Sequence, residues 1–213
     1  MFDFDGTIVD SMPFLENNAV HLLTKDYGFS EVEAQKKYRE TTGLPFIQQM
    51  EIIAPGEDNS QVVNMFEKMK LERIYEQQLF TDSNKVLEDL KKQEYLLGIS
   101  SGTIESIIVK YLRKQGLTMV DDILGWRPGF EKGKDHFDFI KSKYKLSSSN
   151  IIFIGDSIND ARRAKAEDIF FIGRKGMFLT KDFHNVIKEI PVISSLMEVK
   201  EILENWESEK NES

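Results

Sequence analysis

The sequence predicts a doubly wound α/β fold, in which a parallel sheet has helices on both faces and an all-helical segment is inserted. In the second half of the chain, short apolar runs alternate with amphipathic segments of helical length, which is typical of β-α-β units. Residues 13–80, in contrast, contain no strand-like run. We therefore expect an α/β core over 1–12 and 81–206, a helical cap over 13–80, and a frayed charged tail over 207–213.

Three short apolar runs predict the buried parallel strands of the core. These runs are Tyr95–Ser100, Asn150–Ile154 and Ile169–Ile172. Amphipathic periodicity predicts the helices that flank them. These helices are expected at Ser83–Gln93, Thr103–Gln115, Lys134–Tyr144, Ile158–Ala166 and Ser195–Asn205.

The cap is predicted to contain four helices. Pro13 suits the first turn of the first helix, and Ser30 followed by Glu33 is a capping-box pattern that starts the second. The four are expected at residues 13–27, from 30 onward, at 44–53, and from 59 or 60 onward. The two junctions with the core, near 11–13 and 80–82, are the expected hinges.

Composition restricts the classes of function. The net charge of −8 leaves no basic surplus for nonspecific nucleic-acid binding. The absence of cysteine excludes a thiolate nucleophile and a zinc–thiolate site. The chain has no apolar run long enough to predict a membrane span, and its start lacks a signal-peptide pattern. We therefore expect a cytoplasmic protein that binds neither nucleic acid nor membrane.

The first candidate chemical motif lies at the start of the chain. Asp3 and Asp5 are two residues apart, so in an extended chain both carboxylates project to the same side. Gly6 permits a sharp turn after them, and Thr7 adds a hydroxyl for an anion. Taken alone, these residues also fit a simple strand ending in a turn.

Further polar clusters follow or end strand signals. Asp156 and Asp160 come after an apolar run and can share a face at a helix start, where an N-cap role would explain only one of them. The sequence Ser100–Ser101–Gly102–Thr103 closes another run before a helix, where it suits either an anion site or helix capping. Two lysines, Lys132 and Lys134, lie in a charged loop between these clusters.

A carboxylate pair, hydroxyl, lysine and second carboxylate pair in this order resemble the motifs of the haloacid dehalogenase superfamily of phosphatases. The resemblance covers about residues 1–203 and implies a Rossmann-like core. It implies that Asp3 is the nucleophile, which becomes an aspartyl-phosphate, and that Asp5 is the general acid and base. Ser100 would bind a phosphoryl oxygen, and Lys134, with Lys132 as the alternative, would offset negative charge.

The resemblance also implies the rest of the site. Mg²⁺ would be held by Asp3, the Asp5 carbonyl, Asp156 and Asp160. Phosphate oxygens would meet Gly6, Ser101 and Gly102. The cap resembles the C1 type of phosphoglycolate phosphatases and β-phosphoglucomutases, with Thr42 and Gly43 as candidate substrate contacts or a plain interhelix turn. Arg162 and Arg163, after the last motif, are expected on a solvated helix face.

The expected activity is hydrolysis of a small phosphorylated metabolite, because Asp5 can protonate a leaving alcohol. A phosphomutase of the β-phosphoglucomutase type and a non-catalytic binding module are the alternatives. The sequence leaves open the identity of the ester and the oligomeric state. Only two residues precede Asp3, whereas a strand needs around five, so we expect a shortened central strand and an incomplete N-terminus.

Overall fold

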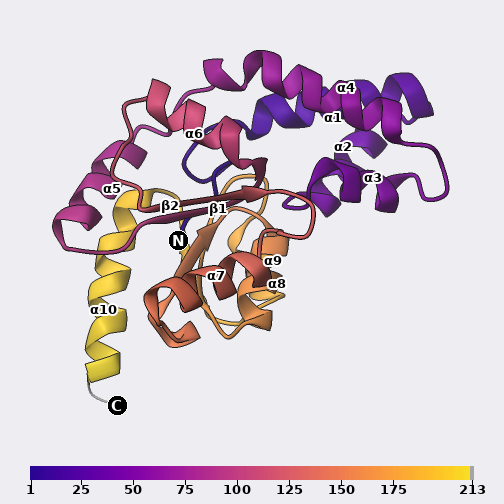
Figure 1. Ribbon diagram of the computed structural model, residues 1–213. Helices are drawn as coiled ribbons and strands as arrows, with labels where there is room; N and C mark the ends of the chain where they lie inside the picture. The colour runs from indigo at the N-terminus through magenta and orange to yellow at the C-terminus, as the bar shows by residue number, and fades with distance from the viewer. Residues whose placement is uncertain (212–213) are drawn as a thin grey trace.

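The computed structural model describes residues 1–211 and contains an α/β core beneath a helical cap (Figure 1). The core strands are parallel, as expected for β-α-β units. They are β1 (Gly98–Ile104), β2 (Asp122–Trp126), β3 (Ile152–Gly155), β4 (Phe170–Arg174) and β5 (Val192–Ile193). The predicted fold class is confirmed.

The first residues of the chain occupy the centre of the sheet. β1 pairs with β2, and β4 pairs with β3 and β5. Phe2 joins these two parts through parallel bridges to Ile99 and Ile154. Its N–H donates to the Gly98 carbonyl at 2.8 Å, and the Asp3 N–H donates to the Ile154 carbonyl at 2.8 Å. Asp3 therefore lies at the carboxyl end of the sheet, where ligands bind in doubly wound folds.

Helices cover both faces of this sheet. They are α5 (Ser83–Lys92), α6 (Glu105–Lys114), α7 (Lys134–Tyr144), α8 (Ile158–Ala166), α9 (Thr180–His184) and α10 (Val199–Asn211), with 3₁₀ turns at Ile74–Glu76, Ser148–Asn150 and Leu196–Glu198. Side chains of α5, α6 and α10 share one apolar cluster with Phe2 and Phe4. Side chains of α7, α8 and α9 form a second cluster around Phe153. The separate clusters are those of a doubly wound sheet.

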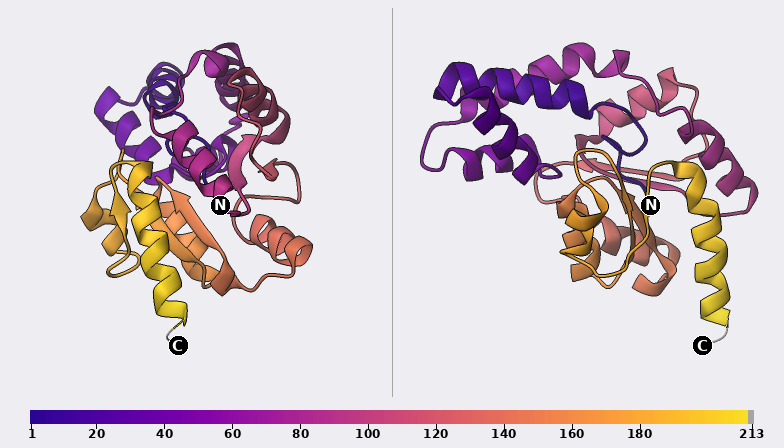
Figure 2. Two further views of the ribbon diagram at one scale, coloured as in Figure 1. Left: turned by 90° about the vertical axis from the view of Figure 1, so that its left-hand side faces the viewer. Right: turned by 180° about the vertical axis from the view of Figure 1, so that it is seen from behind.

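The cap is a separate group of helices beside the sheet (Figure 2), and its side chains form an apolar cluster of their own. Its helices are α1 (Met12–Tyr27), α2 (Glu31–Thr41), α3 (Phe46–Ile53) and α4 (Ser60–Arg73). The predicted capping box is confirmed, because the Ser30 side chain accepts from the Glu33 N–H and the Glu33 side chain accepts from the Ser30 N–H. Phe46 stacks on Phe66 with ring centroids 3.8 Å apart, which ties α3 to α4.

The two connections between cap and core lie side by side. The Asp10 N–H donates to the Gln78 carbonyl at 2.9 Å, and the Phe80 N–H donates to the Ile8 carbonyl at 3.0 Å. The outgoing and returning chains therefore form a short antiparallel pair close to the expected hinges. The domain boundaries given above remain predictions.

Several elements differ from the sequence-based expectation. We did not predict β2, because its two aliphatic residues lie between acidic residues and a glycine, nor the two-residue β5. The short α9 was also missed. α10 continues through most of the stretch expected to fray, and residues 212–213 of that stretch lie outside the described residues.

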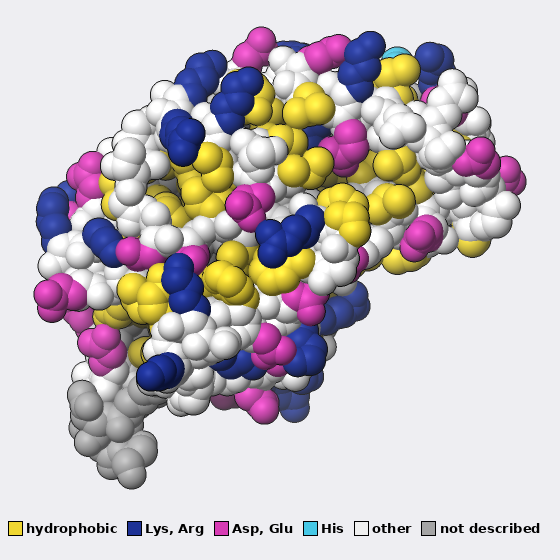
Figure 3. All heavy atoms as spheres, in the orientation of Figure 1, with side chains coloured by type: hydrophobic (Ala, Val, Ile, Leu, Met, Phe, Trp, Pro, Cys, Tyr) yellow, Lys and Arg dark blue, Asp and Glu magenta, His cyan; other side chains and the backbone are white. Residues whose placement is uncertain are grey.

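The outer surface carries both signs of charge. On the face in Figure 3, basic and acidic side chains are interspersed, with hydrophobic side chains between them. Within residues 1–211, none of the helices is both long and apolar enough to cross a bilayer.

Candidate active site

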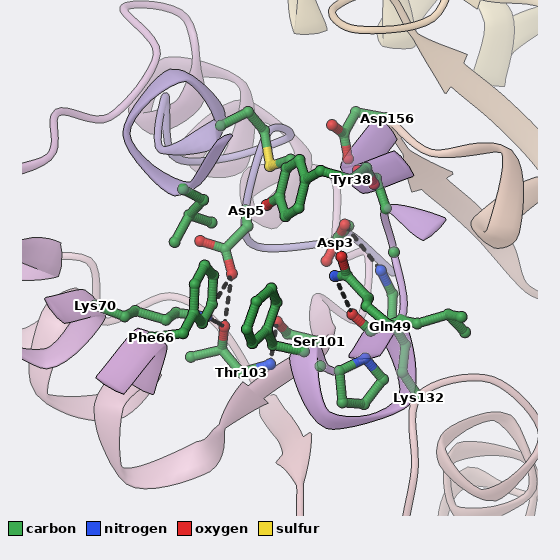
Figure 4. Close-up of a pocket in the computed structure, with 18 of the residues that line it drawn as sticks. Asp3, Asp5, Tyr38, Gln49, Phe66, Lys70, Ser101, Thr103, Lys132 and Asp156 are labelled. Carbon is green, nitrogen blue, oxygen red and sulfur yellow. Dashed lines mark hydrogen bonds and ion pairs between the residues drawn. The ribbon is translucent and has the colours of Figure 1, made fainter. Parts of the chain in front are cut away.

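A small cavity lies between the carboxyl end of the sheet and the cap, with a volume of about 60 Å³ (Figure 4). Its floor comes from the core and includes Asp3, Asp5, Ser101, Lys132 and Asp156. Its roof comes from the cap helices and from the turn between α2 and α3. Core and cap thus meet where the sequence motifs converge.

A buried lysine joins two carboxylates in the floor. The Lys132 Nζ lies 2.8 Å from Asp3 Oδ2 and 2.6 Å from Asp160 Oδ1. All three residues are buried. Burial raises the pKa of Asp3 to about 7, although the Lys132 ammonium opposes this shift. Burial also disfavours the lysine charge, but Asp160 and Asp3 outweigh it and raise the pKa of Lys132. The lysine is therefore a fixed cation beside Asp3.

The same floor contains more negative charge than Lys132 can balance. One carboxylate oxygen from each of Asp3, Asp156 and Asp160 lies within 4.8 Å of the other two. Burial, and then repulsion from Asp3 and Asp160, raises the pKa of Asp156 well above its ordinary value. Within the described part of the chain, Asp160 Oδ2 makes no hydrogen bond. Buried, crowded carboxylate oxygens of this kind fit a hard divalent cation.

Asp5 has a different environment, because polar groups surround its carboxylate (Figure 4). Ser11 Oγ donates to Oδ1 at 2.6 Å, and Thr103 Oγ1 donates to Oδ2 at 2.6 Å. From the cap, the Lys70 Nζ lies 3.4 Å from Oδ2. Burial opposes ionisation of Asp5, but Lys70 and the two hydroxyls outweigh it and lower the pKa. A cap residue thus helps to keep a core carboxyl ionised.

Gly6 allows the turn after Asp5 to pass close to Asp156. Its φ of +76° lies in the left-handed region, and a Cβ atom there would come within 2.1 Å of Asp156 Oδ2. A side chain at this position would therefore displace one of the three clustered carboxylates.

The structure corrects the expectation that Lys134 is the lysine of the site. Lys134 does not reach the cavity: it is the first residue of α7, its side chain is 69% exposed, and it pairs with Asp138. Lys132, which was the alternative, lies two residues earlier in the loop, where the left-handed Gly133 turns the chain before the helix begins. The two lysines therefore face opposite environments, and only Lys132 contacts Asp3.

The two serines within β1 have different surroundings. The Ser100 side chain does not line the cavity: its hydroxyl is buried and lies 2.8 Å from His136 Nδ1. Burial, and then the nearby Lys132 charge, lowers the pKa of His136 to about 3, so this imidazole is neutral. Ser101 and Gly102 line the cavity, as expected of phosphate contacts.

The roof is mainly apolar and aromatic. It includes Met12, Leu15, Tyr38, Phe46 and Phe66, with Gln49, Glu67 and Lys70 as polar side chains. Thr42 and Gly43, the candidate substrate contacts, also line the cavity.

Three residues of this region were missed or misplaced by the sequence analysis. Lys70 follows Phe66 by four residues in the apolar stripe of α4, and a lysine in such a stripe is a signal that could have found it. Thr103 was expected in the anion-site or capping cluster that ends a strand, and its contact with Asp5 was missed. Arg163 was expected on a solvated face, but its side chain is only 18% exposed because it contacts Asp160 and the cap.

Comparison with known proteins gives a consistent family. A family model described as haloacid dehalogenase-like hydrolase matches residues 1–174. The fold resembles a haloacid dehalogenase-like hydrolase from Streptococcus pneumoniae, with a TM-score of 0.78 and 24% identity over 95% of this chain and 96% of that one. A search of curated proteins gave no match.

Two further solved structures share the fold at lower identity. A predicted phosphatase from Clostridium acetobutylicum has a TM-score of 0.80 and 21% identity, over 95% of this chain and 96% of its own. A predicted phosphoglycolate phosphatase from Haemophilus somnus has a TM-score of 0.68 and 20% identity, over 95% of this chain and 96% of its own.

Proposed function

The chain belongs to the haloacid dehalogenase-like hydrolase family, as its motifs indicated, and from this premise we propose that it is a Mg²⁺-dependent phosphatase of small phosphate monoesters. The observation that carries the proposal is the buried contact of Asp3 with Lys132, beside Asp156 and Asp160. A carboxylate nucleophile needs such a cation, because it must approach a substrate that is itself negatively charged.

In the proposed reaction, an Asp3 carboxylate oxygen attacks phosphorus while the bond to the leaving oxygen breaks. Asp5 donates a proton to that oxygen, which leaves as an alcohol. Water then attacks phosphorus, Asp5 takes a proton from the water, and the bond to Asp3 breaks to release phosphate. Ser11 and Thr103 hold the Asp5 carboxyl in one orientation. Because these hydroxyls and Lys70 favour its ionised form, the geometry suits the base step directly, and the acid step requires that Asp5 gain a proton when the negatively charged ester binds beside it.

Asp3, Asp156 and Asp160, with the Asp5 carbonyl, are the groups that would hold Mg²⁺. The cation would supply positive charge against the phosphoryl group and the crowded carboxylates. Lys132 supplies the same kind of charge from the protein, so we assign the role first given to Lys134 to Lys132.

We propose that Ser101 and Gly102 contact phosphoryl oxygens, together with backbone N–H groups near Gly6. Ser100 keeps its proposed role only if its hydroxyl turns away from His136. Thr42 and Gly43 are proposed substrate contacts from the cap.

The cap half of the cavity favours hydrolysis over a mutase reaction. A mutase on this scaffold must also hold a second phosphate group, which calls for several cations. The only lysine or arginine among the residues that line the roof is Lys70, and it lies beside Asp5 and close to Glu67. The cytoplasmic location remains a prediction.

Phosphate release from a panel of small esters, with and without Mg²⁺, tests the proposal. Asp3→Asn keeps the shape of the side chain and removes the nucleophile. We expect release by the native chain with Mg²⁺, and a loss of roughly 10⁴-fold or more in Asp3→Asn. Equal rates in both proteins would rule out Asp3 as nucleophile, and a requirement for a sugar bisphosphate activator would favour the mutase.

A further inference from the structure

One helix of the core holds the cap turn above the cavity. From α8, the Asn159 Nδ2 donates to the Thr42 carbonyl at 2.7 Å, and an Arg163 guanidinium N–H donates to the Gly43 carbonyl at 2.7 Å. The two donors are four residues apart, so they project from the same side of the helix. They therefore bind consecutive carbonyls of the turn between α2 and α3.

The turn rests directly on α8. Gly43 has a φ of +93°, and a Cβ atom there would lie 2.3 Å from Ser157 Oγ and 3.1 Å from Asn159 Cβ. Only a residue without a side chain allows this approach. The contact between cap and core is therefore backbone against helix at this point.

Arg163 also belongs to the charged network of the site. Its guanidinium lies 3.5 Å from Asp160 Oδ1, the same oxygen that Lys132 Nζ approaches at 2.6 Å. Its aliphatic stem packs over Gly133, where a Cβ atom would lie 2.8 Å from Arg163 Cδ. A continuous series of contacts thus runs from the Gly43 carbonyl through Arg163, Asp160 and Lys132 to Asp3.

We propose that Asn159 and Arg163 are positioning residues that clamp the Thr42–Gly43 turn onto the catalytic edge of the sheet. Both donors bind main-chain carbonyls. The clamp therefore fixes the distance between the turn and the sheet, and it does so independently of the side chains that the turn presents to the substrate. Arg163 further makes the position of the turn depend on the arrangement of Asp160, because one guanidinium contacts both. The position of the cap turn over the cavity would then be set by the same charged groups that surround Asp3.

Arg163→Met tests the clamp, because methionine keeps the stem over Gly133 and removes both polar contacts. Lys165→Met is the matched control: it removes a charge from the same helix, and Lys165 bonds only a core carbonyl, that of Val186. The first readout is amide hydrogen exchange at Thr42 and Leu44, whose N–H groups bond the Arg39 and Thr41 carbonyls. We expect exchange at both to accelerate roughly tenfold or more in Arg163→Met and not in Lys165→Met.

The second readout is kinetic and rests on the proposed function. With a generic aryl phosphate and Mg²⁺, we expect KM to rise roughly tenfold in Arg163→Met and kcat to fall by a smaller factor, because Arg163 also contacts Asp160. Asn159→Ala is expected to shift exchange and KM in the same direction by a smaller factor, and it serves if Arg163→Met does not fold.

Two results would overturn the clamp. One is an exchange rate at Thr42 and Leu44 that equals that of the native chain in both Arg163→Met and Asn159→Ala. The other is a uniform acceleration throughout the cap together with a lower melting temperature, which would mean that Arg163 only supports the fold. Because the exchange measurement needs no substrate, failure of the clamp is distinguishable from failure of the proposed phosphatase activity.

Discussion

The core and cap halves of the site differ in the kinds of side chain that they contribute. The core half holds Asp3, Asp156 and Lys132 at the ends of strands and in the adjoining loops, and Asp160 in the first turn of α8, all of them buried. The cap half is mainly apolar and aromatic and contributes one buried cation, Lys70. The contrast suggests a division of labour, in which the core determines the reaction and the cap determines which leaving group fits.

The two halves also differ in electrostatics. In the core, burial raises the pKa values of Asp3 and Asp156, and repulsion among the three clustered carboxylates adds to the effect. Where the cap reaches the core, Lys70 helps to lower the pKa of Asp5 despite burial. The cap is thus joined to the chemistry through Asp5, and the predictions below test how separate the two halves are.

The largest effect is expected at the core lysine. Lys132→Met removes the cation beside Asp3 and leaves two buried carboxylates without it, so phosphate release should fall by roughly 10²- to 10³-fold, the scale of losing one electrostatic contact to the reacting group. Lys134→Met is the matched control and should keep native activity, because Lys134 pairs with Asp138 at the surface. The reverse ranking of these two variants would restore the original assignment.

A smaller effect is expected from the cap cation. Lys70→Met should lower kcat/KM by about tenfold, since it removes one charged contact at Asp5 and one bond to Thr103. The exposed Lys68 lies two residues away on the same helix, and Lys68→Met is the control. If Lys70→Met cost as much as Lys132→Met, the proposed division between reaction and fit would be wrong.

The smallest effect is a pH dependence of the cap–core contact. The pKa of folded Asp5 is lowered from its ordinary value of 3.8, so its contribution to stability is present above that value and lost as pH falls through the folded pKa. The stability difference between the native chain and Lys70→Met should therefore be constant near neutral pH and shrink below about pH 4. Urea unfolding of both proteins at several pH values would measure it, and a difference that grows on acidification would contradict the assignment.

The sequence predicted the core better than the cap. Asp3, Asp156 and Asp160 could be found because strand signals precede or surround them and parallel strands end at one edge of the sheet. The helix boundary did not decide between Lys132 and Lys134, because α7 begins at Lys134 as predicted. The choice depended on the turn at Gly133, whose left-handed backbone separates the buried Lys132 from the exposed Lys134, and the sequence does not show which way each side chain points.

The cap contacts could not be predicted because they depend on how two separately packed units meet. Nothing near Lys70 in the sequence identifies Asp5 as its partner, which lies 65 residues away. The contact of Arg163 with Gly43 spans 120 residues in the same way. Periodicity identifies buried positions within one helix but not the partner of a buried charge across an interface.

The most direct test of the central claim is to trap the intermediate. The native chain with Mg²⁺ and a small phosphate ester would be quenched in acid within one turnover and digested, and the peptide that carries Asp3 would be weighed. We predict a gain equal to one phosphoryl group, removable by hydroxylamine and absent from Asp3→Asn. Steady phosphate release with an unmodified Asp3 peptide at every quench time would contradict the aspartyl-phosphate mechanism.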